Sequence, residues 1–149
     1  MIKTYQIPYT QIGDPIASQE VVYFPMVQTA IEHKGIRTSF LFPSLVDSGS
    51  RHSVFPSSFG EKIGVVVDGV PGIIRSGFGG SVKCYYRKIN IIISINNEER
   101  VFPCEAAFTE KMNNHSIGVL GRDFFEQVEE ISFHQKKFMF EIKVLTPSQ

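Results

Sequence analysis

Short strand-like segments separated by turn signals are the feature that most limits how this chain can fold. Residues 85–95 (YYRKINIIISI) and residues 101–108 are rich in β-branched and aromatic side chains. Between them lies the polar sequence Asn96-Asn97-Glu98-Glu99, which is typical of a tight turn. This arrangement predicts two antiparallel strands joined by a hairpin.

The N-terminal half repeats this pattern. Residues 21–31 have strand-forming composition, although Pro25 demotes part of the segment to an edge or a bulge. A turn that ends in Gly35 follows at residues 32–35. Near the C-terminus, residues 131–133 and 138–142 flank a polar turn and predict another hairpin, with Phe138, Phe140 and Ile142 alternating on one face.

Helical signals are confined to two short segments. Residues 57–63 are expected to form one turn or a short helix that is closed by Gly64. Residues 122–128 place apolar side chains at helical spacing. The chain is therefore predicted to be mainly β, a small closed or nearly closed barrel with one or two short helices. Residues 1–20 are the least patterned and are predicted to form an N-terminal arm of a domain spanning residues 21–149.

Composition narrows the classes of function. A chain of 149 residues fits one domain, and its 15 basic and 15 acidic side chains cancel, which disfavours nucleic acid as a partner. No run reaches the roughly 18 apolar residues of a membrane span, and the N-terminus lacks a signal-peptide core, so no membrane partner and a cytoplasmic location are expected. Cys84 and Cys104 are too few for a disulfide framework, and no metal-ligand spacing is present, so we expect neither a metal nor a cofactor.

Asp47 stands out among the four aspartates by its context. It follows the apolar pair Leu45-Val46 and precedes Ser48-Gly49, so it lies at a strand end in a tight turn. Taken alone, an Asp-Ser-Gly triplet is most often only a turn in which the carboxylate accepts a backbone hydrogen bond.

Two further segments favour a functional role for this triplet. Gly77-Phe78-Gly79-Gly80 has the composition of a mobile hairpin tip, because glycine lets the backbone approach a ligand closely. Residues 118–125 (GVLGRDFF) end a strand and open a helix. Taken alone, the first segment is also consistent with an ordinary glycine-rich turn. Taken alone, the second is also consistent with an ordinary link between a strand and a helix.

In this order and at this spacing, the three segments resemble the retropepsin-like aspartic peptidases, particularly their small bacterial members. The resemblance covers about residues 21–143. It implies a small closed retropepsin-like barrel with a flap hairpin. It also implies a role for each segment: Asp47 as the catalytic residue; Ser48, Gly49 and Ser50 as support in the active-site loop; Gly77, Phe78, Gly79 and Gly80 as the flap; and Val119, Leu120, Gly121, Arg122 and Asp123 as the motif beneath the site. Ser48 stands where the family more often has Thr and Ser50 where it usually has Ala, and Arg51 and His52 make the loop more basic than in many members.

The resemblance also predicts an assembly. Peptide cleavage by an aspartate site needs two carboxylates around one water, and this chain has a single Asp-Ser-Gly triplet. A symmetric homodimer would supply the second Asp47. The implied activity is that of an aspartic endopeptidase acting on extended peptide or protein substrates. Ser48 would brace the two turns across the interface, and Gly49 would accept a substrate amide.

Two other interpretations stay open at this stage. A peptide-binding or scaffold domain could keep the same barrel without cleaving, and an unrelated small barrel could carry the triplet by accident. We further predict that Val119 and Leu120 are core residues under the loop. Arg122 and Asp123 are candidates for ion pairs near Arg51. His52, His115 and His134 are expected to be surface or loop residues, and residues 1–20 remain open as an interface strand, a removable propeptide or a loose arm.

Overall fold

The computed structural model describes residues 1–13, 21–67, 71–77 and 80–146. Within these ranges the chain is mainly β, with two short α-helices and two 3₁₀ turns. The elements follow in this order: β1 (Ile2–Pro8), β2 (Thr10–Gly13), β3 (Val21–Phe24), β4 (Met26–His33), β5 (Ile36–Arg37), β6 (Phe42–Val46), β7 (Val54–Pro56), α1 (Ser57–Glu61), β8 (Ile73–Gly77), β9 (Gly80–Ile95), β10 (Glu98–Thr109), η1 (Glu110–Met112), β11 (Gly118–Leu120), α2 (Arg122–Phe125), β12 (Glu130–His134), η2 (Gln135–Lys137) and β13 (Met139–Leu145).

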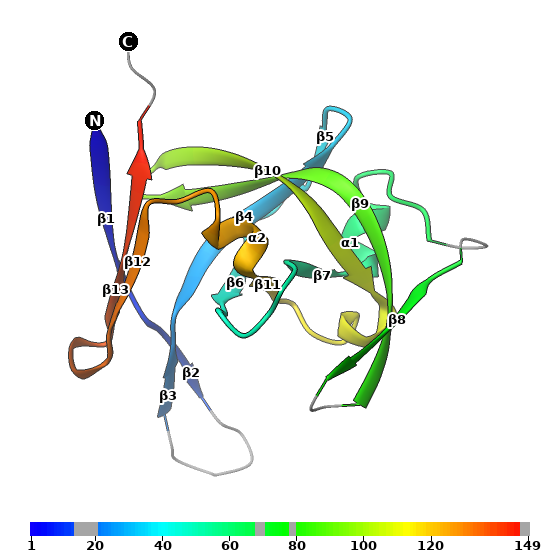
Figure 1. The fold of residues 1–149 in the computed structure, drawn as a ribbon, viewed down its shortest axis with the longest axis horizontal. Helices are drawn as coiled ribbons and strands as arrows, with labels where there is room; N and C mark the ends of the chain where they lie inside the picture. Colours follow the sequence, from blue (N-terminus) through cyan, green and yellow to red (C-terminus); the bar gives the residue numbers. More distant parts are fainter. Residues whose placement is uncertain (14–20, 68–70, 78–79, 147–149) are drawn as a thin grey trace.

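Six of these strands close into a barrel. The sheet runs in the order β4-β6-β11-β7-β10-β9, and a further pairing of β9 with β4 completes the ring. Most neighbours are antiparallel, but β11 pairs in parallel with β6, and β10 pairs in parallel with β7. The predicted closed barrel is therefore confirmed, and Figure 1 shows α2 lying close to β11.

The predicted hairpins β9–β10 and β12–β13 form, and the turn predicted at residues 32–35 joins β4 to β5. The turn residues of β9–β10 and β4–β5 accept unusual backbone angles. Asn96 and Asn97 join β9 to β10 with φ of 52° and 63°. Lys34 and Gly35 join β4 to β5 with φ of 49° and 82°. Two consecutive positive φ angles define the hairpin turn that matches the twist of the flanking strands.

The core lies inside the barrel and continues under the terminal strands. Its fully buried large side chains are Phe55, Phe108, Phe124, Phe140, Ile31, Ile63, Ile91, Ile93, Leu120 and Ile142. β1 pairs along its length with β13, and Tyr5 and Ile7 from β1 join this core. The strands β1 and β13 lie side by side (Figure 1), and at their shared end the Thr146 amide donates to the Met1 carbonyl at 2.8 Å. The division into an arm (1–20) and a domain (21–149) stays a prediction.

Several local expectations differ from the structure. The turn or helix expected over residues 57–63 is a helix that ends at Glu61. Pro25 separates β3 from β4, so the predicted strand over residues 21–31 is two strands. The helix expected over residues 122–128 ends at Phe125. Phe138 was expected to share a face with Phe140 and Ile142, and this was wrong: it closes the turn before β13 with φ of 49°, is about half exposed at 47%, and packs on Tyr23 with ring centroids 4.5 Å apart.

Candidate active site

Asp47 directly follows β6, where a distant strand, β11, holds its backbone. The side chains of Phe42, Ser44 and Val46 alternate into the core, which fixes the direction in which β6 leaves the barrel. The Asp47 amide donates to the Leu120 carbonyl at 3.0 Å, continuing the parallel pairing of β6 with β11. Asp47 itself is half-buried, so its carboxyl group is held in place yet reachable from solvent.

A tight turn orients the Asp47 carboxylate. The Gly49 amide donates to Asp47 Oδ1 at 2.9 Å, and the Ser50 amide donates to the Asp47 carbonyl at 3.2 Å. A Cβ atom at position 49 would lie 3.1 Å from Oδ1, so glycine leaves this approach open. Ser48 and Gly49 are exposed, and the Ser50 hydroxyl donates to the His52 carbonyl at 2.7 Å. One carboxylate oxygen is thus engaged by the turn.

The start of α2 supports this turn from below. The Arg122 amide donates to the Ser50 carbonyl at 2.8 Å. Gly121 allows the close approach, because a Cβ there would lie 2.5 Å from the His52 carbonyl oxygen and 2.7 Å from that of Ser50. Leu120 is fully buried as expected, whereas Val119 is only partly buried. The chain segments 47–50 and 119–123 therefore meet as the sequence motifs suggested.

Ser53 connects the two segments and was not identified from the sequence. Its hydroxyl donates to Asp123 Oδ1 at 2.6 Å and accepts a bond from the Gly121 amide at 3.1 Å. Its own amide donates to Asp123 Oδ2 at 2.8 Å. No sequence signal pairs a serine with an aspartate 70 residues away.

The expected role of Asp123 in an ion pair near Arg51 was wrong. Asp123 accepts the two bonds from Ser53 and a third from the Phe124 amide at 2.7 Å. Among the described residues, no ion pair joins Asp123 or Arg122 to Arg51. Amide and hydroxyl donors thus satisfy a carboxylate that had been expected to pair with arginine.

The β8–β9 hairpin lies across a groove from the Asp47 turn. Its strands pair from Ile73 with Cys84 to Gly77 with Gly80. The candidate flap residues Gly77 and Gly80 stand at the end of this pairing, and Gly80 has a φ of +102°. Phe78 and Gly79 lie outside the described residues.

The groove has a volume of about 380 Å³ and is shared between the loop and the hairpin. Gly49, Ser50, Arg51 and His52 line one side, together with Val54 and Ala107. The hairpin contributes Arg75, Ser76, Cys84 and Tyr86. The Tyr86 ring is central, because the His52 ring packs edge-on against it with centroids 5.0 Å apart and the Arg75 guanidinium lies over it at 5.4 Å.

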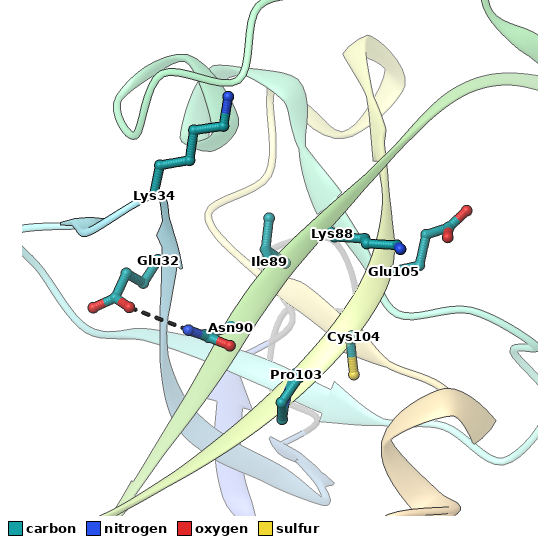
Figure 2. Close-up of a pocket in the computed structure, with 8 residues that line it drawn as sticks. All are labelled: Glu32, Lys34, Lys88, Ile89, Asn90, Pro103, Cys104 and Glu105. Carbon is teal, nitrogen blue, oxygen red and sulfur yellow. Dashed lines mark hydrogen bonds between the residues drawn. The ribbon is translucent and has the colours of Figure 1, made fainter.

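A second hollow of about 370 Å³ opens between β4, β9 and β10 (Figure 2), and none of its lining residues comes from the Asp47 loop. Glu32 accepts a hydrogen bond from Asn90 at 3.2 Å there. Burial raises the pKa of the Cys104 thiol in this hollow to about 12, so the thiol stays protonated and is a poor nucleophile. The cysteine of this hollow therefore offers no nucleophile, and the groove beside the Asp47 turn is the candidate site.

Within the described ranges, no three His, Cys, Asp or Glu side chains gather closely enough to hold a metal ion. None of the helices in that part of the chain has the length and apolar character needed to cross a membrane. His115 is exposed in a loop, as expected, and His134 is partly exposed at the end of β12, whereas His52 is half-buried against Tyr86.

Comparison with solved structures identifies the architecture. A retropepsin-like aspartic protease from Rickettsia conorii matches with a TM-score of 0.57 and 12% sequence identity, over 97% of this chain and 93% of that chain. The chain has a retropepsin-like fold. The protease of EIAV, solved with a bound inhibitor, has a TM-score of 0.46 and 16% identity, over 77% of this chain and 92% of that chain.

No protein-family profile matches the sequence, and no curated protein matches it either. At 12% identity the likeness establishes the retropepsin-like fold alone. The chemistry of the site must therefore be argued from its own residues.

Proposed function

We propose that this chain is an aspartic endopeptidase that works as a homodimer, with Asp47 of each subunit contributing one catalytic carboxylate. The observation that carries the proposal is the Asp47 turn itself. A half-buried carboxylate ends a barrel strand, the Gly49 amide holds one of its oxygens, and α2 supports the loop from below. The retropepsin-like fold supports the proposal of peptide hydrolysis.

The dimer is part of the proposal because one carboxylate is not enough. The sequence contains a single Asp-Ser-Gly triplet, so a second activating carboxylate has to come from a second copy of the chain. Ser48 and Gly49 are exposed in the isolated chain, which leaves the tip of the turn free to meet its counterpart. In this arrangement Ser48 would brace the turns, and Ser50 would keep the loop closed through its bond to His52.

The chemistry then follows from paired carboxylates. Two carboxylates about 3 Å apart share one proton, as is well known for aspartic-protease dyads. The ionised Asp47 would accept a proton from a bound water, which attacks the peptide carbonyl. The protonated Asp47 would donate a hydrogen bond to the carbonyl oxygen as negative charge develops there.

The hairpin would cover the substrate. Gly77, Phe78, Gly79 and Gly80 are proposed to close over an extended peptide, add main-chain hydrogen bonds and exclude water. The groove between this hairpin and the Asp47 turn would receive the substrate side chains. A cytoplasmic location remains part of the prediction.

Asp47→Asn is the direct test. Asparagine keeps an oxygen for the Gly49 amide, so the turn should stay intact, but it cannot accept the proton of the attacking water. Cleavage of a fluorogenic peptide library should fall by about a thousandfold or more. Glu105→Gln, in the second hollow, is the matched control and should cleave normally.

Sedimentation of both proteins measures the assembly in the same experiment. Loss of cleavage with an intact dimer supports the proposal, whereas unchanged cleavage by Asp47→Asn removes Asp47 from the chemistry. A wild-type chain that binds peptides and cuts none of them would instead favour a non-catalytic binding domain. A wild-type protein that cleaves as a strict monomer would refute the shared site.

A further inference from the structure

The groove beside Asp47 carries an excess of positive charge. Arg51 lines it from the active-site loop, and Arg75 lines it from β8 across the opening. Among the residues of described position that line it, none is an aspartate or a glutamate. Because the chain as a whole has no net charge, this local excess is a property of the groove and not of the composition.

Arg75 is oriented by its neighbour. Its Nε donates to the Tyr86 hydroxyl at 3.0 Å, and its guanidinium lies over the Tyr86 ring at 5.4 Å. Stacking of this kind fixes the plane of a guanidinium and leaves its terminal nitrogens as donors in a forked arrangement. Within the described ranges these terminal nitrogens make no hydrogen bond to the protein.

Asp47, two residues before Gly49, is the acidic group of the proposed chemistry, and the two other acidic groups beside Arg51 do not neutralise the arginine pair. Asp123 and Glu126 lie with Arg51 around a neighbouring hollow. Asp123 is occupied by the two Ser53 donors, and Glu126 is exposed. Among the residues with described positions, neither Arg51 nor Arg75 forms an ion pair within 4.0 Å.

We propose that this groove is a specificity subsite for an acidic substrate side chain, so that the enzyme prefers peptides with Asp or Glu close to the bond cleaved. A carboxylate accepts two parallel hydrogen bonds from a guanidinium, which suits the free donors of Arg75. The groove also begins at Gly49, two residues after Asp47, which places the subsite next to the proposed chemistry. The location of this subsite next to the reaction rests on the proposed peptidase function. The preference for an acidic side chain is a separate claim.

Matched fluorogenic peptides test the preference. A series of eight-residue substrates carries Glu or Gln at one position at a time, and kcat/KM is measured for each pair. We expect the Glu peptide to be cut about tenfold better at one position or a symmetric pair of positions, which corresponds to about 1.4 kcal/mol. The ratio should shrink as ionic strength rises, since salt screens a partly exposed charge.

Substitutions connect the preference to the two arginines. Arg51→Gln and Arg75→Gln should each lower the Glu-to-Gln ratio, and the double variant should bring it close to one. Arg51→Lys and Arg75→Lys keep the charge but lose the fork, so part of the ratio should remain. Arg87→Gln is the matched control and should keep the wild-type ratio, because Arg87 lies next to Tyr86 outside the groove.

Two outcomes separate this inference from the proposed function. Efficient cleavage with equal rates for Glu and Gln peptides at every position overturns the acidic subsite and leaves the peptidase proposal standing. If nothing is cleaved, binding of fluorescently labelled Glu and Gln peptides decides. A Glu preference that the two Arg→Gln changes abolish supports the subsite, and equal binding refutes it.

Discussion

Replacing Gly121 with alanine should destabilise the protein by forcing the Asp47 loop away from α2. The added methyl carbon would lie 2.5 Å from the His52 carbonyl oxygen, 2.6 Å from its carbon and 2.7 Å from the Ser50 carbonyl oxygen. All three atoms belong to the backbone, so no side chain can rotate aside to relieve the clash. The loop or the helix start has to move.

The expected cost comes from two sources. An extra methyl group in a packed site costs about 1–3 kcal/mol. Moving the loop also weakens two hydrogen bonds, from the Arg122 amide to the Ser50 carbonyl at 2.8 Å and from the Gly121 amide to the Ser53 hydroxyl at 3.1 Å. Each contributes about 0.5–1.5 kcal/mol net. We expect the free energy of unfolding to fall by about 3 kcal/mol in total.

Urea unfolding measures this loss. With a slope of about 2 kcal/mol per molar urea, the midpoint should fall by about 1.5 M. Wild type and variant must be compared at one protein concentration, because the proposed dimer would gain stability with concentration. Gly13→Ala is the control, since nothing lies within 4 Å of a Cβ atom built at Gly13, and its midpoint should barely move.

A Gly121→Ala midpoint within about 0.2 M of wild type would correspond to less than about 0.5 kcal/mol. The close packing of the loop on the helix start would then not limit stability, and the reasoning would fail. A loss of the same size in Gly13→Ala would point to a general effect of replacing glycine.

Further expectations concern Cys104 and Glu98. Because burial raises the pKa of the Cys104 thiol to about 12, iodoacetamide should alkylate it far more slowly in the folded protein than in urea, and fast labelling of the folded protein by mass spectrometry would contradict this. Hydrogen bonds from Lys3 and Tyr5 hold the pKa of Glu98 below its usual value, so the stability from this contact is present above the unfolded pKa and is lost as pH falls through the folded pKa. Urea midpoints at about pH 7 and pH 3.5 should therefore differ less in Glu98→Gln than in wild type, and an equal loss in both would refute a contribution from Glu98.

Features set by neighbouring residues could be predicted from the sequence. The Asn96-Asn97 turn and the turn at Gly64 that follows α1, with φ of +86°, depend on local backbone preferences. The Asp47 turn was likewise recognisable, because an aspartate before a glycine readily accepts a backbone hydrogen bond. The position of Phe138 was predicted wrongly, because the alternation of side chains along β13 was extended to the residue before the strand. That residue adopts a left-handed turn conformation, which phenylalanine rarely occupies.

Features that join distant segments could not be predicted in the same way. The pairing of β4 with β9 that closes the barrel leaves no periodic signal in either strand. The bonds between Ser53 and Asp123 are another such case, because both side chains are polar residues of types common on surfaces. Charge patterns suggested an arginine partner for Asp123, whereas the folded chain provides amide and hydroxyl donors at closer range.

The parallel pairing of β6 with β11 also has a consequence for the timing of biosynthesis. The segment that carries Asp47 is complete early in translation, yet its backbone partner at Leu120 emerges from the ribosome more than 70 residues later. Contacts so far apart along the chain form late during folding. A nascent polypeptide would therefore lack the Leu120 support of this loop until that distant strand had been made, whereas the local bonds from Gly49 and Ser50 to Asp47 can form earlier.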